Sequence, residues 1–243
     1  PLPLPADLLA ELDTCGGIVP YALSTRVLAH FGITALCERL TQTPEEAKAA
    51  AEAIGYPVAL KGISPDITHK TETGLVKLNI ADAGALRQAW DELERSMNLH
   101  HPDARREGML IQSMVTDDVV ETIAGVNRDP AFGSAVVVGL GGIFVELLRD
   151  VSLELAPLSP AKAMINRLQA AKLLQGFRGK QPADIAALEE TLVRLGRMAH
   201  ALGERLVSLD LNPLMVLPEG QGVRIVDIVM QARPSGDSPK HLP

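Results

Sequence analysis

The sequence predicts a protein of the α+β (α/β) class, because short strand patterns alternate with capped amphipathic helices. Of its 243 residues, 47% are hydrophobic, which is enough for a core in one domain or in two lobes. Aromatic residues make up only 3%, so the core should consist mainly of Leu, Val, Ile and Ala.

The N-terminal region contains one predicted helix and one short strand. Residues 1–17 are Pro-rich and then weakly helical, and we expect them to form a tail. A helix around residues 22–31 should end at Gly32, because glycine is a common helix stop. Residues 33–37 are then predicted to form a short strand.

The next helix carries clear start and stop signals. Thr43 is suited to the N-cap, Pro44 to the first turn, and Glu46 closes a capping box three residues after the cap. Gly55 is expected to end this helix.

Residues 55–70 are the stretch around which the site is organised. The apolar run 58–60 is too short for a helix and is bounded by proline and glycine, so it predicts a strand. Lys61 follows it and would present a flexible cation, although a solvated lysine at a strand end fits equally well. The polar loop 64–73 suits a mobile loop over a polar ligand, and it carries His69, which alone is better explained as a surface histidine.

The pattern continues with a half-buried strand at 76–80 and a helix capped by Asp82. One apolar stripe of that helix comprises Leu86, Ala89, Trp90, Leu93 and Met97. The charged loop 98–108 is a plausible boundary between two lobes, and residues 109–114 predict the next strand.

The second half begins with a β-branched run at 134–139, which predicts a strand buried on both faces. It leads into Gly141 and Gly142, whose backbone N–H groups suit phosphate oxygens, although any tight hairpin also uses glycine. Residues 160–176 are expected to form one helix, and Asp184 caps a long helix that a glycine ends.

Two late strands, 206–212 and 223–229, give the strongest argument for a metal site. Alternation places Asp210 and Asn212 on one face of the first strand, about 7 Å apart. Asp227 would lie on an apolar face of the second, which is costly without compensation. These three oxygen-bearing side chains suit Mg²⁺. Alternatively, Asp210 and Asn212 cap a turn at the following proline while Asp227 pairs with an arginine.

Four motifs together carry a family resemblance. Residues 55–70, the Gly-Leu-Val-Lys-Leu at 74–78, the Gly-Leu-Gly-Gly-Ile-Phe-Val-Glu at 139–146 and the Leu-Asp-Leu-Asn-Pro-Leu at 209–214 resemble ADP-forming acyl-CoA synthetases. The similarity is to the β subunit of acetate–CoA ligase (ADP-forming), which is related to succinyl-CoA synthetase within the ATP-grasp superfamily. It covers roughly residues 18–230.

The resemblance implies an ATP-grasp fold, with a nucleotide bound between an N-lobe at 18–108 and a C-lobe at 109–233. Residues 234–243, rich in Pro, Ser and charge, are then expected to be a disordered C-terminal tail.

The resemblance also implies the roles of several residues. Asp210, Asn212 and Asp227 match the Mg²⁺ ligands of the family, and His69 matches a histidine proposed to be phosphorylated. Lys61 would neutralise charge on the transferring phosphoryl group. The implied nucleotide-binding residues, including a backbone hinge for adenine, are Lys61, Gln112, Ser113, Met114, Glu121, Gly141, Gly142 and Glu146. Lys70 and Arg128 are secondary candidates for phosphate contacts, and a cross-strand charge pair is an equal alternative for Glu121.

Two positions depart from the family pattern. Ser113 stands where many members have a glutamate, which matters little if adenine is recognised mainly by backbone groups. Leu75 stands where the second of two glycines is usual, and we expect it to stiffen or narrow the loop near the phosphates.

The implied reaction converts ATP, a carboxylic acid and CoA into ADP, phosphate and acyl-CoA through a phosphohistidine. The implied cofactors are ATP/ADP and Mg²⁺, and the partner is a CoA-binding α-type subunit or fused domain, in a hetero- or homo-oligomer. The main alternative is a non-catalytic ligand-sensing ATP-grasp-like domain of a protein acetyltransferase, for which the metal ligands should have decayed. A third possibility, an ATP-grasp ligase that joins a carboxylate to an amine, is disfavoured by the histidine loop.

Composition excludes several other classes. The net charge of −7 and the scattered Lys and Arg residues argue against nucleic-acid binding. Cys15 and Cys37 have no metal-binding spacing and fit a reducing cytoplasm. No apolar run approaches 18 residues, so we expect no membrane segment and a cytoplasmic location.

Overall fold

The computed structural model describes residues 3–67, 73–115, 118–142, 150–176 and 181–233. The chain divides into two compact units. The larger unit comprises Pro1–Val19, Leu23–Ala35 and Asp117–Pro243, and the smaller comprises Pro20–Ala22 and Leu36–Thr116. No helix among the described residues is long and apolar enough to cross a membrane.

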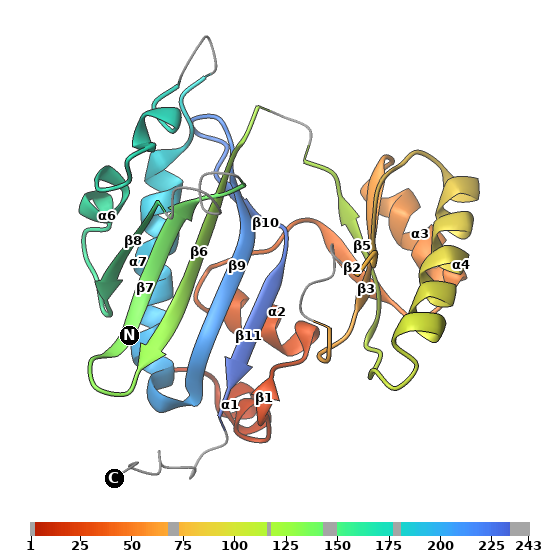
Figure 1. Cartoon of the computed structure of the whole chain (residues 1–243), viewed down its shortest axis with the longest axis horizontal. Helices are drawn as coiled ribbons and strands as arrows, with labels where there is room; N and C mark the ends of the chain where they lie inside the picture. Colours follow the sequence, from red (N-terminus) through yellow and green to blue (C-terminus); the bar gives the residue numbers. More distant parts are fainter. Residues whose placement is uncertain (1–2, 68–72, 116–117, 143–149, 177–180, 234–243) are drawn as a thin grey trace. The chain divides into compact units, whose positions relative to one another are not determined.

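The smaller unit is an antiparallel four-stranded sheet with two helices on one face (Figure 1). The strand order is β2 (Glu38–Thr41), β5 (Gly108–Ser113), β3 (Val58–Ile63) and β4 (Val76–Ile80). The helices are α3 (Pro44–Ile54) and α4 (Ala83–His100). Their apolar faces pack on alternate residues of the strands, such as Leu60 and Ile111, and form one core.

The helix starts in this unit follow the predicted capping chemistry. Thr43 Oγ1 accepts a hydrogen bond from the Glu46 N–H at 3.2 Å, and Asp82 Oδ1 accepts one from the Ala85 N–H at 2.9 Å. The Glu46 carboxylate accepts from the N–H of Gln42, one residue before the cap. The predicted stripe of α4 is buried at all five positions: Leu86, Ala89, Trp90, Leu93 and Met97.

The larger unit is built on an antiparallel seven-stranded sheet, with strand order β1-β11-β9-β6-β7-β8 and β10 paired to β9. The strands are β1 (Gly17–Ile18), β6 (Val120–Asp129), β7 (Gly133–Leu140), β8 (Val151–Leu155), β9 (Leu206–Val216), β10 (Val223–Ile225) and β11 (Ile228–Ala232). The helical segments are α1 (Ala6–Asp13), α2 (Tyr21–His30, whose first two residues belong to the smaller unit), α6 (Lys162–Asn166), η1 (Ala171–Leu173), α7 (Ile185–Leu202) and η2 (Gly203–Arg205).

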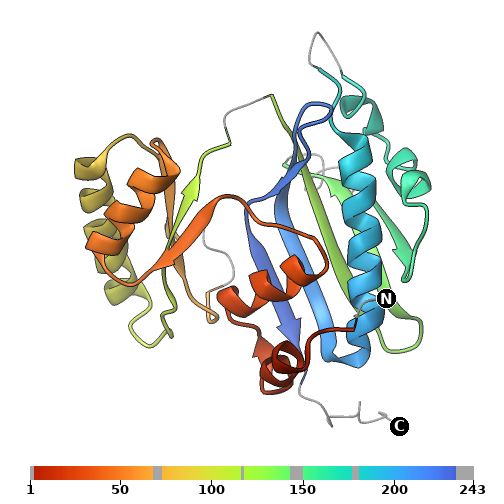
Figure 2. The same cartoon turned by 180° about the vertical axis from the view of Figure 1, so that it is seen from behind.

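Helices cover only one face of this sheet. Figure 2 shows α7 and α2 on the same side of it, and buried strand residues such as Val136 and Leu211 face that side. Among the described residues of the unit no helix covers the opposite face, which is in front in Figure 1 and is called the open face below. Alternation places Glu121, Asn127, Asp210 and Gln231 on the open face.

The N-terminal region differs from the expected tail. Leu8 and Leu12 of α1 are buried, Arg205 donates to the Asp13 carboxylate at 2.5 Å, and β1 pairs with β11. The expected strand at 33–37 is wrong, because only Ala35 forms a single bridge there, to Ile225, and β2 starts at Glu38.

The predicted continuous helix at 160–176 is also wrong, because it breaks after α6. The buried carboxylate of Asp150 accepts the backbone N–H groups of Gln169 and Ala170, both at 2.8 Å. In a continuous helix these N–H groups would donate to carbonyls four residues earlier. The Asp150 carboxylate accepts them instead, so the helical hydrogen bonding is interrupted here.

One predicted strand needs correction, and one observed strand was not predicted. Residues 134–139 do form β7, but Ala135 and Val137 are only half-buried because they lie on the open face. Strand β8 was not predicted, and its exposed Val151, Leu153 and Leu155 alternate with more buried polar residues.

The boundary between the units lies later than residue 108. Strand β5 pairs with β2 and β3 of the smaller sheet, so it belongs to the smaller unit and the chain changes units after Thr116.

Candidate functional site

Lys61 is a buried cation within β3, not a solvated strand-end lysine. Its residue is only 4% exposed, and two more strand residues follow it. Val58 and Leu60 face the core with α3 and α4, so alternation places Lys61 on the opposite face of the sheet. Burying an ammonium group is costly unless it is compensated, and Lys61 does have an interaction partner.

His69 and Lys70 lie outside the described residues, but both ends of their loop are described. Before the loop, Ser64 Oγ accepts the Asp66 N–H at 3.1 Å, and Asp66 accepts hydrogen bonds from Arg105. This hydrogen-bonded ion pair lowers the pKa of the Asp66 carboxyl to about 2. The Arg105 bonds therefore tie the start of the histidine loop to the residues just before β5.

After the loop, Leu75 behaves as a core residue. Its side chain is fully buried in the cluster beneath α3 and α4, and its carbonyl accepts the Gly62 N–H at 2.9 Å. The expectation that Leu75 narrows the loop near the phosphates is therefore not supported by its placement.

The end of β5 differs from a simple adenine hinge. The Gln112 side chain is 1% exposed, and its Nε2 donates to Glu38 Oε2 at 2.7 Å. The Tyr21 hydroxyl donates to the same carboxylate at 2.9 Å. The Ser113 N–H donates to the Cys37 carbonyl, so this donor is already engaged.

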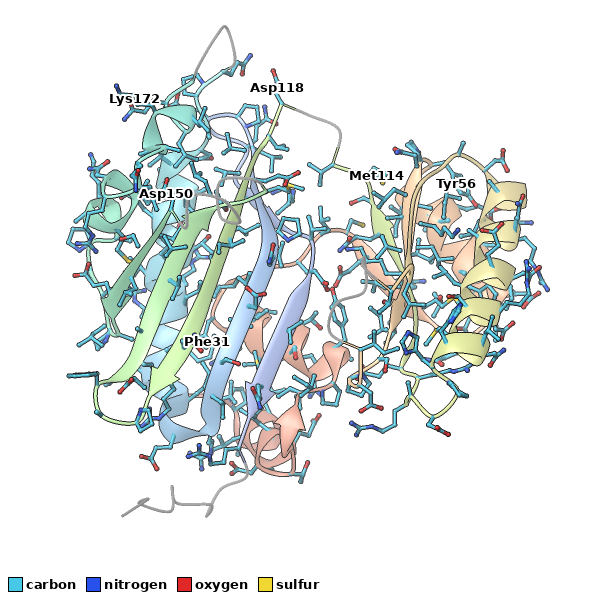
Figure 3. The ribbon with its side chains drawn as sticks, viewed as in Figure 1. Phe31, Tyr56, Met114, Asp118, Asp150 and Lys172 are labelled. Carbon is cyan, nitrogen blue, oxygen red and sulfur yellow. The ribbon has the colours of Figure 1, made fainter. Side chains whose placement is uncertain are left out.

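Met114 follows the last residue of β5 (Figure 3), and its backbone is the better candidate for the adenine edge. Sequence reasoning missed Glu38 and Tyr21, since no local pattern links Glu38 to Gln112, which lies 74 residues later.

Glu121 and the glycine turn are brought together in the larger unit. The Gly141 N–H donates to the Glu121 carbonyl at 2.7 Å. A Cβ on Gly141 would lie 3.0–3.2 Å from Glu121 atoms, so this close approach favours glycine. Gly142 has a φ of +62°, which also favours glycine. Glu146 lies outside the described residues.

The late strands bring the three predicted metal ligands together on the open face. Asp210 and Asn212 alternate with buried leucines on β9 and are both exposed. The Asn212 N–H donates to the Asp227 carbonyl at 3.3 Å, so these two residues are direct neighbours across the strands. Asp227 directly precedes β11 and is half-buried, and it stands beside the exposed Asn212 while the following Ile228 is buried opposite Leu211.

Two details of this prediction need correction. Pro213 does not end the strand, because β9 continues to Val216 with an irregularity in its pairing to β6. Residues 223–229 are not one strand, because Asp227 lies in a break between β10 and β11, where its Oδ1 accepts the Ile228 N–H at 3.0 Å.

The donor set is chemically suited to a hard cation. It offers two carboxylates and one amide oxygen, and Mg²⁺ prefers few protein oxygens because it retains water and phosphate oxygens. Among the described residues no group of three or more His, Cys, Asp and Glu side chains is placed to hold a metal ion. A site here would therefore combine the Asn212 amide with the two carboxylates, and water and phosphate oxygens would complete the coordination.

Arg128, a secondary candidate for phosphate contact, lies elsewhere. It alternates with Asn127 on β6, so it points away from the open face, and it pairs with Glu204 at 3.2 Å. This pairing argues against a phosphate role.

Comparison with known proteins identifies the family of the chain. Residues 17–231 match the ATP-grasp domain family. The β subunit of acetate–CoA ligase [ADP-forming] II from Pyrococcus furiosus is 40% identical over 204 residues, which cover 83% of this chain and 86% of that protein.

The chain belongs to the ATP-grasp family of ADP-forming acyl-CoA synthetases.

Other relatives are longer. Acetate–CoA ligase [ADP-forming] I from Archaeoglobus fulgidus is 38% identical, and the match covers 89% of this chain but only 32% of that protein. Among solved structures, acetyl-coenzyme A synthetase 1 from Ca. Korarchaeum cryptofilum in complex with coenzyme A, Ca-AMPCP and HgCl⁺ gives a TM-score of 0.86 at 38% identity, covering 93% of this chain and 98% of that one. Another structure of that protein contains coenzyme A and Mg-AMPPCP, with a phosphohistidine segment pointing towards the nucleotide-binding site.

Proposed function

We propose that this chain is the ATP-binding part of an ADP-forming acyl-CoA synthetase, which acts with a CoA-binding subunit or fused domain. The observation that carries the proposal is the pairing of Asn212 with Asp227, beside Asp210, on the open face of the sheet. These oxygens would hold the Mg²⁺ of the nucleotide, and the ion would neutralise phosphate charge.

Further roles are proposed within each unit, taken by itself. In the larger unit, Glu121 and the turn of Gly141 and Gly142 would contact the ribose and the phosphates. In the smaller unit, the buried Lys61 would offset negative charge on the transferring group. The backbone near Met114 would contact adenine.

The proposed acceptor is the imidazole of His69. A neutral ring nitrogen would attack the γ-phosphorus, so that an N–P bond forms while the bond to the bridging oxygen breaks and ADP leaves. This phosphoryl group would then pass to the carboxylate of the acyl substrate in the CoA-binding part, and the CoA thiol would attack the acyl carbon so that phosphate leaves and acyl-CoA forms.

The test is incubation of the chain with γ-labelled ATP and Mg²⁺, with and without a candidate CoA-binding partner. We expect an acid-labile, base-stable label that is lost in His69→Ala and kept in His100→Ala, which removes an exposed histidine of α4. Equal labelling of both variants, or no labelling with the partner present, would reject the phosphohistidine step.

A further inference from the structure

The open face carries a row of uncharged polar side chains to which the proposed site assigns no role. Asn127 on β6 stands opposite Ser208 on β9, and Ser208 stands opposite Gln231 on β11. These three residues are called the amide row below. Asn127 is exposed, and Ser208 and Gln231 are half-buried.

The amide row is one row from Asp210 and two rows from Asn212, because Ser208, Asp210 and Asn212 are successive open-face residues of β9. The next row across the same strands contains Gly125, Asp210 and Val229, and rows on one face are about 7 Å apart. Gly125 contributes no side chain between Asn127 and the metal ligands. It is required there, because a Cβ would lie 2.3 Å from the Leu209 carbonyl oxygen.

The order of residues along the open face gives the direction of a bound nucleotide. Glu121, the proposed ribose contact, stands opposite Met215 near one end of the face. Asn212 and Asp227 follow, then Asp210, and then the amide row. A triphosphate that runs from the ribose past the metal ligands therefore continues towards Asn127, Ser208 and Gln231.

We propose that the amide row binds the terminal phosphoryl group, as the γ-phosphate of ATP and as inorganic phosphate in the reverse reaction. This inference rests on the proposed function. Ser208 Oγ donates to Gln231 Oε1 at 3.5 Å, so this bond uses the amide oxygen and not the two N–H donors of Gln231. Amide and hydroxyl donors form hydrogen bonds with phosphate oxygens without adding charge.

The neutrality of the row has a chemical consequence. A guanidinium or ammonium group would hold the phosphoryl group more strongly, because charge-assisted bonds are about twice as strong as neutral ones. A group that must move on to a second acceptor is better served by uncharged donors, with the charge offset by the metal.

If the amide row had only a structural role, substitutions in it would change the stability of the sheet and not the affinity for nucleotide. Strands β9 and β11 are already joined by a backbone ladder from Ile228 to Ala232, so the single 3.5 Å side-chain bond adds little to their pairing.

The test compares two nucleotides by isothermal titration calorimetry of the full chain with Mg²⁺: ADP and the non-hydrolysable β,γ-methylene analogue of ATP. We expect Gln231→Leu to weaken binding of the analogue about tenfold, as for loss of a hydrogen bond to a charged group, and to change ADP affinity less than twofold. Asn127→Ala should likewise weaken binding of the analogue more than binding of ADP. Gln221→Leu, the same change in an exposed turn, should shift neither affinity.

The outcomes separate the inference from the proposed function. If Gln231→Leu weakens both nucleotides equally, or neither, the amide row does not contact the terminal phosphoryl group. If the unchanged chain binds neither nucleotide, the proposed function fails and this inference fails with it. Gln231→Glu, which keeps the size of the side chain, provides a second test should the leucine variant unfold. Its added charge should weaken the analogue more than ADP.

Discussion

Leu75 offers the sharpest test of how the smaller unit is built. The family resemblance leads us to expect a glycine there, and hence a disturbance of the phosphate loop by leucine. In the structure its side chain is 0% exposed and packs with Val58, Leu60 and the helices α3 and α4. We therefore expect Leu75→Ala to destabilise the protein.

The size of the effect follows from burial. Truncating a fully buried leucine to alanine costs about 3–5 kcal/mol, through lost transfer energy and the residual cavity. Leu78, three residues later in β4, provides a matched control because it is 58% exposed. Leu78→Ala should cost less than about 1 kcal/mol.

The assay is urea denaturation of both variants, followed by circular dichroism and fitted for the free energy of unfolding. Trp90 lies in the same core, so its fluorescence reports on this unit directly. If Leu75→Ala lost less than about 1 kcal/mol, or no more than Leu78→Ala, the assignment of Leu75 to the core would be refuted.

Three further predictions concern hydrogen bonds and charge. The hydroxyl of Tyr56 is buried without a partner among the described residues, so Tyr56→Phe should raise the free energy of unfolding by up to about 1 kcal/mol in urea denaturation; a loss would show a missing partner. Arg105→Ala should raise the pKa of Asp66 from about 2 towards the ordinary value of about 3.9, measured by NMR titration of the carboxyl carbon. Because the folded pKa is depressed, the stability from this pair is present above about pH 4 and is lost as the pH falls towards 2, and the variant should not show that loss. Asp184 accepts the Ala187 N–H at 3.0 Å and the Gly222 N–H at 2.8 Å, so Asp184→Ala should cost about 2–3 kcal/mol; a cost under about 0.5 kcal/mol would contradict both bonds.

The elements that sequence reasoning predicted well are those determined by local chemistry. The capped helices α3, α4 and α7 begin at the expected residues Thr43, Asp82 and Asp184, because cap and first turn lie within a few residues of each other. The face of β9 that carries Asp210 and Asn212 also follows from local alternation.

The errors arise where distant groups compete with local patterns. The buried Asp150 captures backbone donors of Gln169 and Ala170 and so breaks a helix that the local sequence favours. The break at Asp227 and the side chain of Gln112 likewise depend on partners in other strands, Asn212 and Glu38. Such partners leave no periodic signal in their own segments.

The placement of the predicted site shows a similar division. Residue types, spacing and the family resemblance suggested Asp210, Asn212 and Asp227 as metal ligands, and the strand register showed that two of them are direct neighbours. The amide row could not have been found from sequence, because Asn127, Ser208 and Gln231 belong to three strands far apart in the chain.

The central claim is that Asn212 and Asp227 hold the metal of a bound nucleotide. Its most direct test is the affinity for ADP measured by calorimetry with and without Mg²⁺, in the unchanged chain, in Asp227→Asn and in Glu219→Gln, which neutralises an exposed carboxylate of the β9–β10 turn. We expect Mg²⁺ to strengthen ADP binding at least about tenfold in the unchanged chain and in Glu219→Gln, and much less in Asp227→Asn. Unaltered Mg²⁺-dependent binding in Asp227→Asn would contradict the claim.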